Sequence, residues 1–120
     1  GALSLHAARL GLPLRGVVSF HGSLGRTHAA KPGDVKARVM VLHGGSDTFI
    51  SDDELTAFMK EMRELNVDLA FESYPNVKHG FTNPEATAKG QKYGLNLAYD
   101  ASADARSWES MKRFWATVLA

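Results

Sequence analysis

The 120-residue sequence contains no cysteine, which excludes both a disulfide framework and a thiolate metal site. It also lacks the apolar run of about 18 residues that a membrane span requires, and it has no basic block and no internal repeat. We therefore expect no contact with a membrane or with nucleic acid, and no repeat architecture. Because a chain without disulfides fits a reducing compartment, we expect the protein in the cytoplasm.

The residues that are present have the composition of an ordinary globular protein. Apolar residues make up 44% of the sequence and charged residues 22%, and the formal net charge is +1. Both fractions are normal for a globular domain. A chain of this length buries roughly two-thirds of the surface of its unfolded state, so a hydrophobic core is possible. We expect residues 1–120 to form a single domain.

Short apolar segments alternate with helical patterns along the chain. Residues 2–10 predict a helix, and residues 17–20 predict a strand. Residues 38–42 form a near-continuous apolar run, typical of a strand buried on both faces of a parallel sheet. Residues 67–74 alternate between apolar and polar side chains and predict a third strand. This order favours an α/β fold with about three parallel strands flanked by helices.

Two later segments have apolar residues at helical spacing. One helix is predicted after Ser51, which with Glu54 fits a capping box. Its apolar face is Leu55, Phe58, Met59, Met62 and Leu65. The last helix is predicted from about Asp104. Its apolar face, expected in the core, is Trp108, Met111, Phe114, Trp115, Val118 and Leu119. Residues 75–101 show no clean period, and we expect a long loop there.

Functional groups of parallel α/β sheets lie just past the carboxyl ends of the strands. That rule points to three places in the sequence. The first is His21-Gly22, after the first strand. The second is the turn from Gly44 to Asp47, and the third is the loop that contains His79.

Asp47 and His79 are the residues best suited to chemistry. A histidine at this edge can take a proton from a nucleophile through one ring nitrogen. Its other nitrogen would donate to Asp47, whose carboxylate would stabilise the imidazolium. The plainer alternatives are a turn-forming role for Asp47 and a surface position for His79.

The remaining histidines favour structural roles. We expect His43 and His21 to be satisfied hydrogen-bond donors at strand ends, and His6 and His28 to face solvent. Asp47 and His79 have no third ligand nearby at useful spacing, so we expect no metal. The sequence has neither phosphate-binding glycine pattern, and we expect no cofactor.

The nucleophile is missing. Asp followed by His after successive strands matches the last two members of an α/β-hydrolase triad, whose nucleophile stands earlier on a G-x-S-x-G or G-x-C-x-G elbow. No such pentapeptide occurs in the sequence. Ser19, Ser23 and Ser46 lack the flanking glycines and the strand-to-helix setting. We therefore expect no nucleophile in this chain.

Three segments closely resemble the C-terminal half of the dienelactone hydrolase (carboxymethylenebutenolidase-like) family. They are VMVLHGGSDTFIS, NVKHGFTNP and AYDASADARSWESMKRFW. The resemblance implies an α/β-hydrolase fold and cleavage of small esters or lactones through a Cys or Ser nucleophile. It also implies that Asp47 is the triad acid and His79 the triad base. Gly1 is similar to the last glycine of the family's elbow, so we expect the chain to begin just after the nucleophile.

The resemblance also implies substrate contacts in the HGFTNP loop, at Phe81 and Asn83. The dienelactone enzymes carry an arginine near the position of Asn83, where it helps to hold the substrate carboxylate. Because this chain has no arginine there, the resemblance does not extend to a dienelactone substrate.

The strand at residues 17–20 would normally pair with the nucleophile strand, so we expect it to present an open edge. We expect a chain that is inactive alone and that forms a homodimer through this edge, or pairs with an N-terminal half. The first alternative is a non-catalytic truncated α/β domain that self-associates through the same edge. The second is an unrelated small α/β binding domain.

Overall fold

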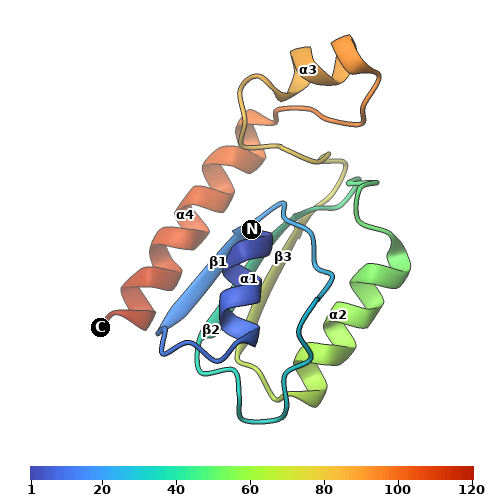
Figure 1. Ribbon diagram of the computed structural model, residues 1–120. Coiled ribbons are helices and arrows are strands. Elements are labelled where there is room, and N and C mark those ends of the chain that lie inside the picture. The colour runs from blue at the N-terminus through green and yellow to red at the C-terminus, as the bar shows by residue number, and fades with distance from the viewer.

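A three-stranded parallel sheet with helices on both faces forms the protein, as the computed structural model of residues 1–120 shows (Figure 1). The strands lie in the order β1-β2-β3. They are β1 (Gly16–Phe20), β2 (Arg38–Gly44) and β3 (Leu69–Tyr74). The helices are α1 (Ala2–Arg9), α2 (Asp52–Glu64), α3 (Ala86–Tyr93) and α4 (Ala101–Val118). The predicted α/β class and the three parallel strands are confirmed.

The central strand β2 joins two hydrophobic cores. Six of its seven residues are buried, and successive side chains point to opposite faces of the sheet. Val39 and Val41 pack with α1 and α2 on one face. Met40 and Leu42 pack beneath α4 on the other. β2 is therefore covered by helices on both sides, as its near-continuous apolar sequence predicts.

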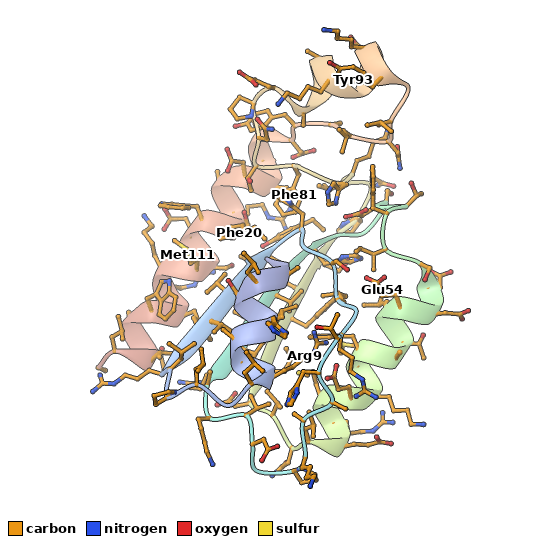
Figure 2. All side chains as sticks on the ribbon, viewed as in Figure 1. Arg9, Phe20, Glu54, Phe81, Tyr93 and Met111 are labelled. Carbon is orange, nitrogen blue, oxygen red and sulfur yellow. The ribbon has the colours of Figure 1, made fainter.

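A buried ion pair joins α1 to α2. Arg9 donates from Nε to Oε2 of Glu61 at 2.9 Å and from Nη2 to Oε1 at 2.7 Å. The two side chains are only 3% and 6% exposed. Arg9 also donates to the carbonyl oxygens of Leu24 and Gly25, in the loop after β1. Figure 2 shows Arg9 between the two helices. One guanidinium thus connects three segments.

The capping box predicted for α2 forms only in part. Ser51 Oγ accepts the N–H of Glu54, as predicted. The Glu54 carboxylate does not return to Ser51; it accepts the N–H of Leu24 at 2.9 Å. On the apolar face, Phe58, Met62 and Leu65 are buried and Leu55 is half-buried. Met59 is 38% exposed, at the border of the stripe.

The predicted long loop at residues 75–101 contains the helix α3, so that expectation is wrong in part. Gly90 lies inside this helix because its backbone approaches the segment after it. A Cβ there would come within 2.5 Å of the Leu97 carbonyl oxygen. A mid-helix glycine weakens the helical signal, which explains why the sequence does not indicate α3. Figure 1 shows α3 standing away from the sheet.

Helix α4 begins earlier than predicted, and its predicted apolar face is only partly in the core: Phe114 is buried, and Met111, Trp115 and Val118 pack against the core. Its N-cap is Asp100, whose Oδ1 accepts the N–H of Ala103. The buried residues are Ala103, Ser107, Ser110 and Phe114. Trp108 and Leu119, predicted to lie in the core, are 54% and 57% exposed. Small side chains let α4 approach the sheet closely, which turns the large apolar residues toward the open side of β1. None of the helices combines the length and apolar character needed to span a membrane.

We expect Arg9→Met to lower the free energy of unfolding by about 3–5 kcal/mol, because it leaves the buried Glu61 carboxylate without its main partner. The matched control is Arg38→Met. Arg38 pairs with Asp68 at 2.7 Å on the surface, and an exposed pair contributes only about 0–1 kcal/mol. Urea unfolding followed by circular dichroism measures both losses. Equal losses in the two variants would show that burial does not matter here.

Candidate active site

The carboxyl ends of β2 and β3 bring Asp47 and His79 together. After β2, the chain turns through Gly44 and Gly45, and the N–H of Ser46 donates to the carbonyl oxygen of Val77 at 2.8 Å. This backbone contact ties the turn after β2 to the loop after β3. His79 Nδ1 then lies 2.8 Å from Asp47 Oδ2. The predicted proximity of the two side chains is confirmed.

The two carboxylate oxygens of Asp47 have separate partners. Oδ1 accepts the N–H of Phe49 at 2.9 Å, which is the turn-forming contact of an aspartate. Oδ2 faces His79. The turn-forming role and the histidine contact, which the sequence presents as alternatives, are therefore both present. The first contact holds the carboxylate in place for the second.

The Asp47 carboxylate decides which ring nitrogen of His79 carries the proton. The Asp47 side chain has no exposed surface, whereas the His79 side chain is 27% exposed. A carboxylate can only accept hydrogen bonds, so Nδ1 of His79 must donate. Nε2 is then left as the acceptor. An imidazole held in this tautomer can take a proton through Nε2.

Two further segments hold the pair from outside. Phe49 packs its ring against His79, with ring centroids 4.5 Å apart. Asn96, after α3, donates from Nδ2 to Thr48 Oγ1 at 2.8 Å and to the Ser46 carbonyl oxygen at 3.2 Å. The segment that the sequence leaves as an undivided loop therefore closes over the turn that carries Asp47.

His21, which the sequence assigns a structural role, lies at the same edge. Its ring centroid is 5.5 Å from that of His79, and its Nε2 lies 2.9 Å from Thr82 Oγ1. Burial lowers the pKa of His21, and the nearby charge of His79 lowers it further. The sequence does contain one signal for this placement: His21 directly follows β1, as Asp47 follows β2 and His79 follows β3.

The start of the chain lies close to the end of β1. A Cβ on Gly1 would overlap Ser19 Oγ, and a Cβ on Gly22 would come within 2.7 Å of the Gly1 Cα, so both positions require glycine. Ser19 is fully buried and its hydroxyl has no hydrogen-bond partner. The amino group of Gly1 contributes to the lowered pKa of His21. Gly1 therefore lies at the same edge of the sheet as the Asp47–His79 pair.

Phe81 and Asn83 occupy different environments. Phe81 is 0% exposed, and its ring packs against Tyr74 and His21. Its contact with substrate stays a prediction, and its packing places it directly against His21 at the edge that carries the pair. Asn83 is exposed, and its Oδ1 accepts the N–H of Glu85 at 3.0 Å. Its contact with substrate stays a prediction.

The other histidines make no hydrogen bond with the pair, although the charge of Asp47 reaches His43 and raises its pKa against the larger effect of burial. His43 is buried in β2, where burial lowers its pKa. His28 is exposed, as expected, and His6 is half-buried. No group of three or more His, Cys, Asp or Glu side chains gathers in a way that could hold a metal ion.

Known proteins are similar to this chain in sequence and in fold. The model of the dienelactone hydrolase family matches residues 1–119. An uncharacterized protein of Caenorhabditis elegans is 34% identical over 117 residues, which cover 95% of this chain and 72% of the worm protein. A dienelactone hydrolase-like promiscuous phosphotriesterase from metagenomic libraries is 35% identical, with a TM-score of 0.78. The solved structure named m3DLH is 36% identical, with a TM-score of 0.82.

The match covers most of this chain but less than half of the solved relatives. It extends over 95% of this chain and 46% of each of the two solved chains. The three-stranded sheet therefore corresponds to part of a larger α/β-hydrolase fold. With its family match over residues 1–119, the chain belongs to the dienelactone hydrolase family.

Proposed function

We propose that this chain provides the acid and the base of a dienelactone-hydrolase-type enzyme that cleaves small esters or lactones. Asp47 is the acid and His79 the base. The observation that carries the proposal is the hydrogen bond between a fully buried carboxylate and a partly exposed imidazole at the strand ends. Family membership supplies the reaction class.

In this mechanism Nε2 of His79 takes the proton from the nucleophile as that group attacks the substrate carbonyl. The same proton then passes to the leaving alcohol, or to the ring oxygen of a lactone. In the second half, His79 takes a proton from water as that water attacks the acyl group, and it returns the proton to the nucleophile when the bond between acyl group and nucleophile breaks. Asp47 stabilises the imidazolium in both halves and does not itself take the proton.

The nucleophile comes from outside these 120 residues. The chain has no cysteine. Ser19, at the end of β1, is fully buried and has no hydrogen-bond partner, and Ser23 and Ser46 lack the flanking glycines of an elbow. Gly1 lies against the end of β1, beside Ser19 and Gly22. A segment that docks beside Gly1 would therefore enter the site next to His79.

We also propose that the protein is located in the cytoplasm, because a chain without cysteine fits a reducing compartment.

We expect the chain alone to show no esterase activity. In a serine hydrolase, loss of the nucleophile lowers kcat by a factor on the order of 10⁶. Hydrolysis of p-nitrophenyl acetate by the purified chain measures this. Turnover above background that disappears in His79→Ala would contradict the proposal, because it would require a nucleophile within these residues.

We expect activity to return when the chain is mixed with a separate fragment carrying the remaining residues of the 36% identical relative. Asp47→Asn should then lower kcat by about 10⁴-fold, because the wrong tautomer of His79 is favoured, and His79→Gln should abolish turnover. The matched control is the exposed His28→Gln, which should keep full activity. A complex that forms and turns over equally well with His79→Gln would rule out His79 as the base.

A second candidate function, self-association of a non-catalytic domain, is favoured by the open edge of β1. The strand GVVSF has no charged residue. A groove of about 500 Å³ lies along it between α1 and α4, and none of its lining residues is charged. Leu3, on α1, is 84% exposed, and Met111 and Trp115 border the groove from α4. Figure 2 shows Phe20 and Met111 on this side of the molecule.

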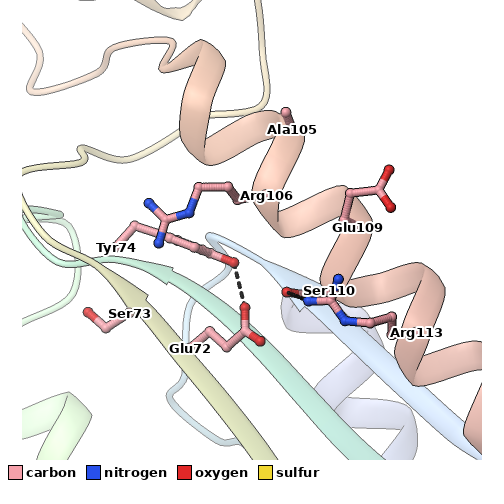
Figure 3. A pocket seen from close by; sticks show the side chains of 8 residues that line it. All are labelled: Glu72, Ser73, Tyr74, Ala105, Arg106, Glu109, Ser110 and Arg113. Carbon is pink, nitrogen blue, oxygen red and sulfur yellow. Dashed lines mark hydrogen bonds between the residues drawn. The ribbon is translucent and has the colours of Figure 1, made fainter.

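The other edge of the sheet contrasts with it. Figure 3 shows the groove of about 560 Å³ between β3 and α4, which is lined by Glu72, Arg106, Glu109 and Arg113 among others. Charged side chains protect an edge strand from pairing with another chain. β3 has this protection and β1 lacks it, so we propose that a second copy covers β1 when no other fragment does.

We expect sedimentation equilibrium at micromolar concentration to give a dimer of the 13.0 kDa chain. Leu3→Glu should shift the equilibrium to the monomer, because it places a charge in the uncharged groove along β1. Tyr93→Glu is the matched control, since Tyr93 is 62% exposed on α3, away from β1. A well-folded wild-type monomer would contradict self-association through this edge.

A further inference from the structure

His21 makes a contact that the strand order does not require. β1 and β3 are not neighbours in the sheet, because β2 lies between them. The His21 side chain nevertheless reaches the loop after β3, where its Nε2 lies 2.9 Å from Thr82 Oγ1. Its ring also packs edge-on against Phe81 at 5.1 Å. His21 therefore connects the end of β1 to the loop that carries His79.

The backbone of His21 is held in an unusual conformation to make this contact. Its φ angle is +40°, and the other non-glycine residues with positive φ are both asparagines. Positive φ is uncommon for any residue other than glycine, although asparagine and histidine adopt it more often than most. The N–H of His21 donates to the Leu42 carbonyl oxygen at 2.9 Å, so the residue stays attached to β2. Strained residues of this kind persist where the surroundings enforce them, and they concentrate at functional sites.

The ring of His79 is held by three neighbours. Asp47 binds Nδ1 at 2.8 Å. Phe49 packs at a centroid distance of 4.5 Å, and His21 lies at 5.5 Å with a near-perpendicular ring. Of the three, only His21 approaches from the β1 side. Its position therefore affects both the orientation and the electrostatic surroundings of His79.

The charge state of His21 matters because His79 becomes an imidazolium when it takes a proton. Two positive imidazoles at this separation would repel each other. Burial is the largest cause that lowers the pKa of His21, followed by the charge of His79; the amino group of Gly1 lowers it further and Asp47 raises it. His21 is therefore uncharged at neutral pH, and it does not oppose protonation of its neighbour.

We propose that His21 is a positioning residue for His79, which holds the base-carrying loop to the end of β1 through its contacts with Thr82 and Phe81. The inference rests on the proposed role of His79 as the base. His21 itself exchanges no proton with substrate. Its effect is to keep the Nδ1–H of His79 on the Asp47 carboxylate.

Nitrogen-15 NMR of the histidine rings tests the positioning without any catalytic activity. In the wild-type chain we expect a slowly exchanging Nδ1–H on His79. Thr82→Val removes the hydrogen bond to His21 with little change of shape, and His21→Asn removes the ring while suiting the positive φ. Both should speed exchange of this proton by roughly tenfold, about the contribution of one hydrogen bond. His28→Asn is the control and should leave the rate unchanged.

An unchanged exchange rate in a folded Thr82→Val chain would overturn the proposal, even if His21→Asn failed to fold. A pH titration gives the second readout. His79→Gln should raise the pKa of His21, because it removes the charge that lowers it. The same His21 pKa in both chains would show that the rings are not coupled. Neither readout needs a nucleophile. The positioning role of His21 can therefore fail while the acid–base role of Asp47 and His79 stands, and the acid–base role can fail while the positioning role stands.

Discussion

Burial of β2 on both faces is the constraint on which the rest of the structure depends. Its side chains alternate between two cores, one beneath α1 and α2 and the other beneath α4. The strand can be buried in this way only with β1 and β3 paired on either side, and both pair in parallel. Parallel pairing places the carboxyl ends of all three strands at one edge. His21, Asp47 and His79 meet because each one follows a different strand to that edge.

Polar contacts hold the segments that hydrophobic packing alone would leave loosely placed. Helix α1 has only eight residues, and a helix that short has few apolar side chains with which to define its position. Arg9 fixes it by binding Glu61 and the carbonyl oxygens of Leu24 and Gly25. Glu54 adds a hydrogen bond to the N–H of Leu24. These contacts anchor the loop that starts at His21, so they also support the edge that carries the site.

The two edges of the sheet differ in a way that governs assembly. At β3, Tyr74 donates to Glu72 at 2.7 Å, and burial together with Glu72 raises the pKa of Tyr74 to about 12. Arg106 lies over the Tyr74 ring, 5.0 Å from its centroid. That edge is polar and internally satisfied. The β1 edge has only apolar neighbours, including the exposed stripe of α4. Either proposed partner, a complementary fragment or a second copy, would bind the same groove along β1. The two partners would therefore compete for it.

The sequence by itself determined the strands, the start of α2 and the Asp47–His79 pair. Each of these depends on local signals: apolar runs, a serine cap, and residues that directly follow a strand. The tertiary structure decided the rest. Arg9 and Glu61 are 52 residues apart, and His21 and Thr82 are 61 apart, so no local pattern connects them. Gly90 conceals α3 because the close approach of Leu97, which requires the glycine, leaves no local signal. On α4, Phe114 reaches the core as its spacing predicts, but small residues take the other buried positions and leave Trp108 and Leu119 exposed. Local sequence encodes which elements form and where they end, but contacts between distant segments exist only once the sheet has brought those ends together.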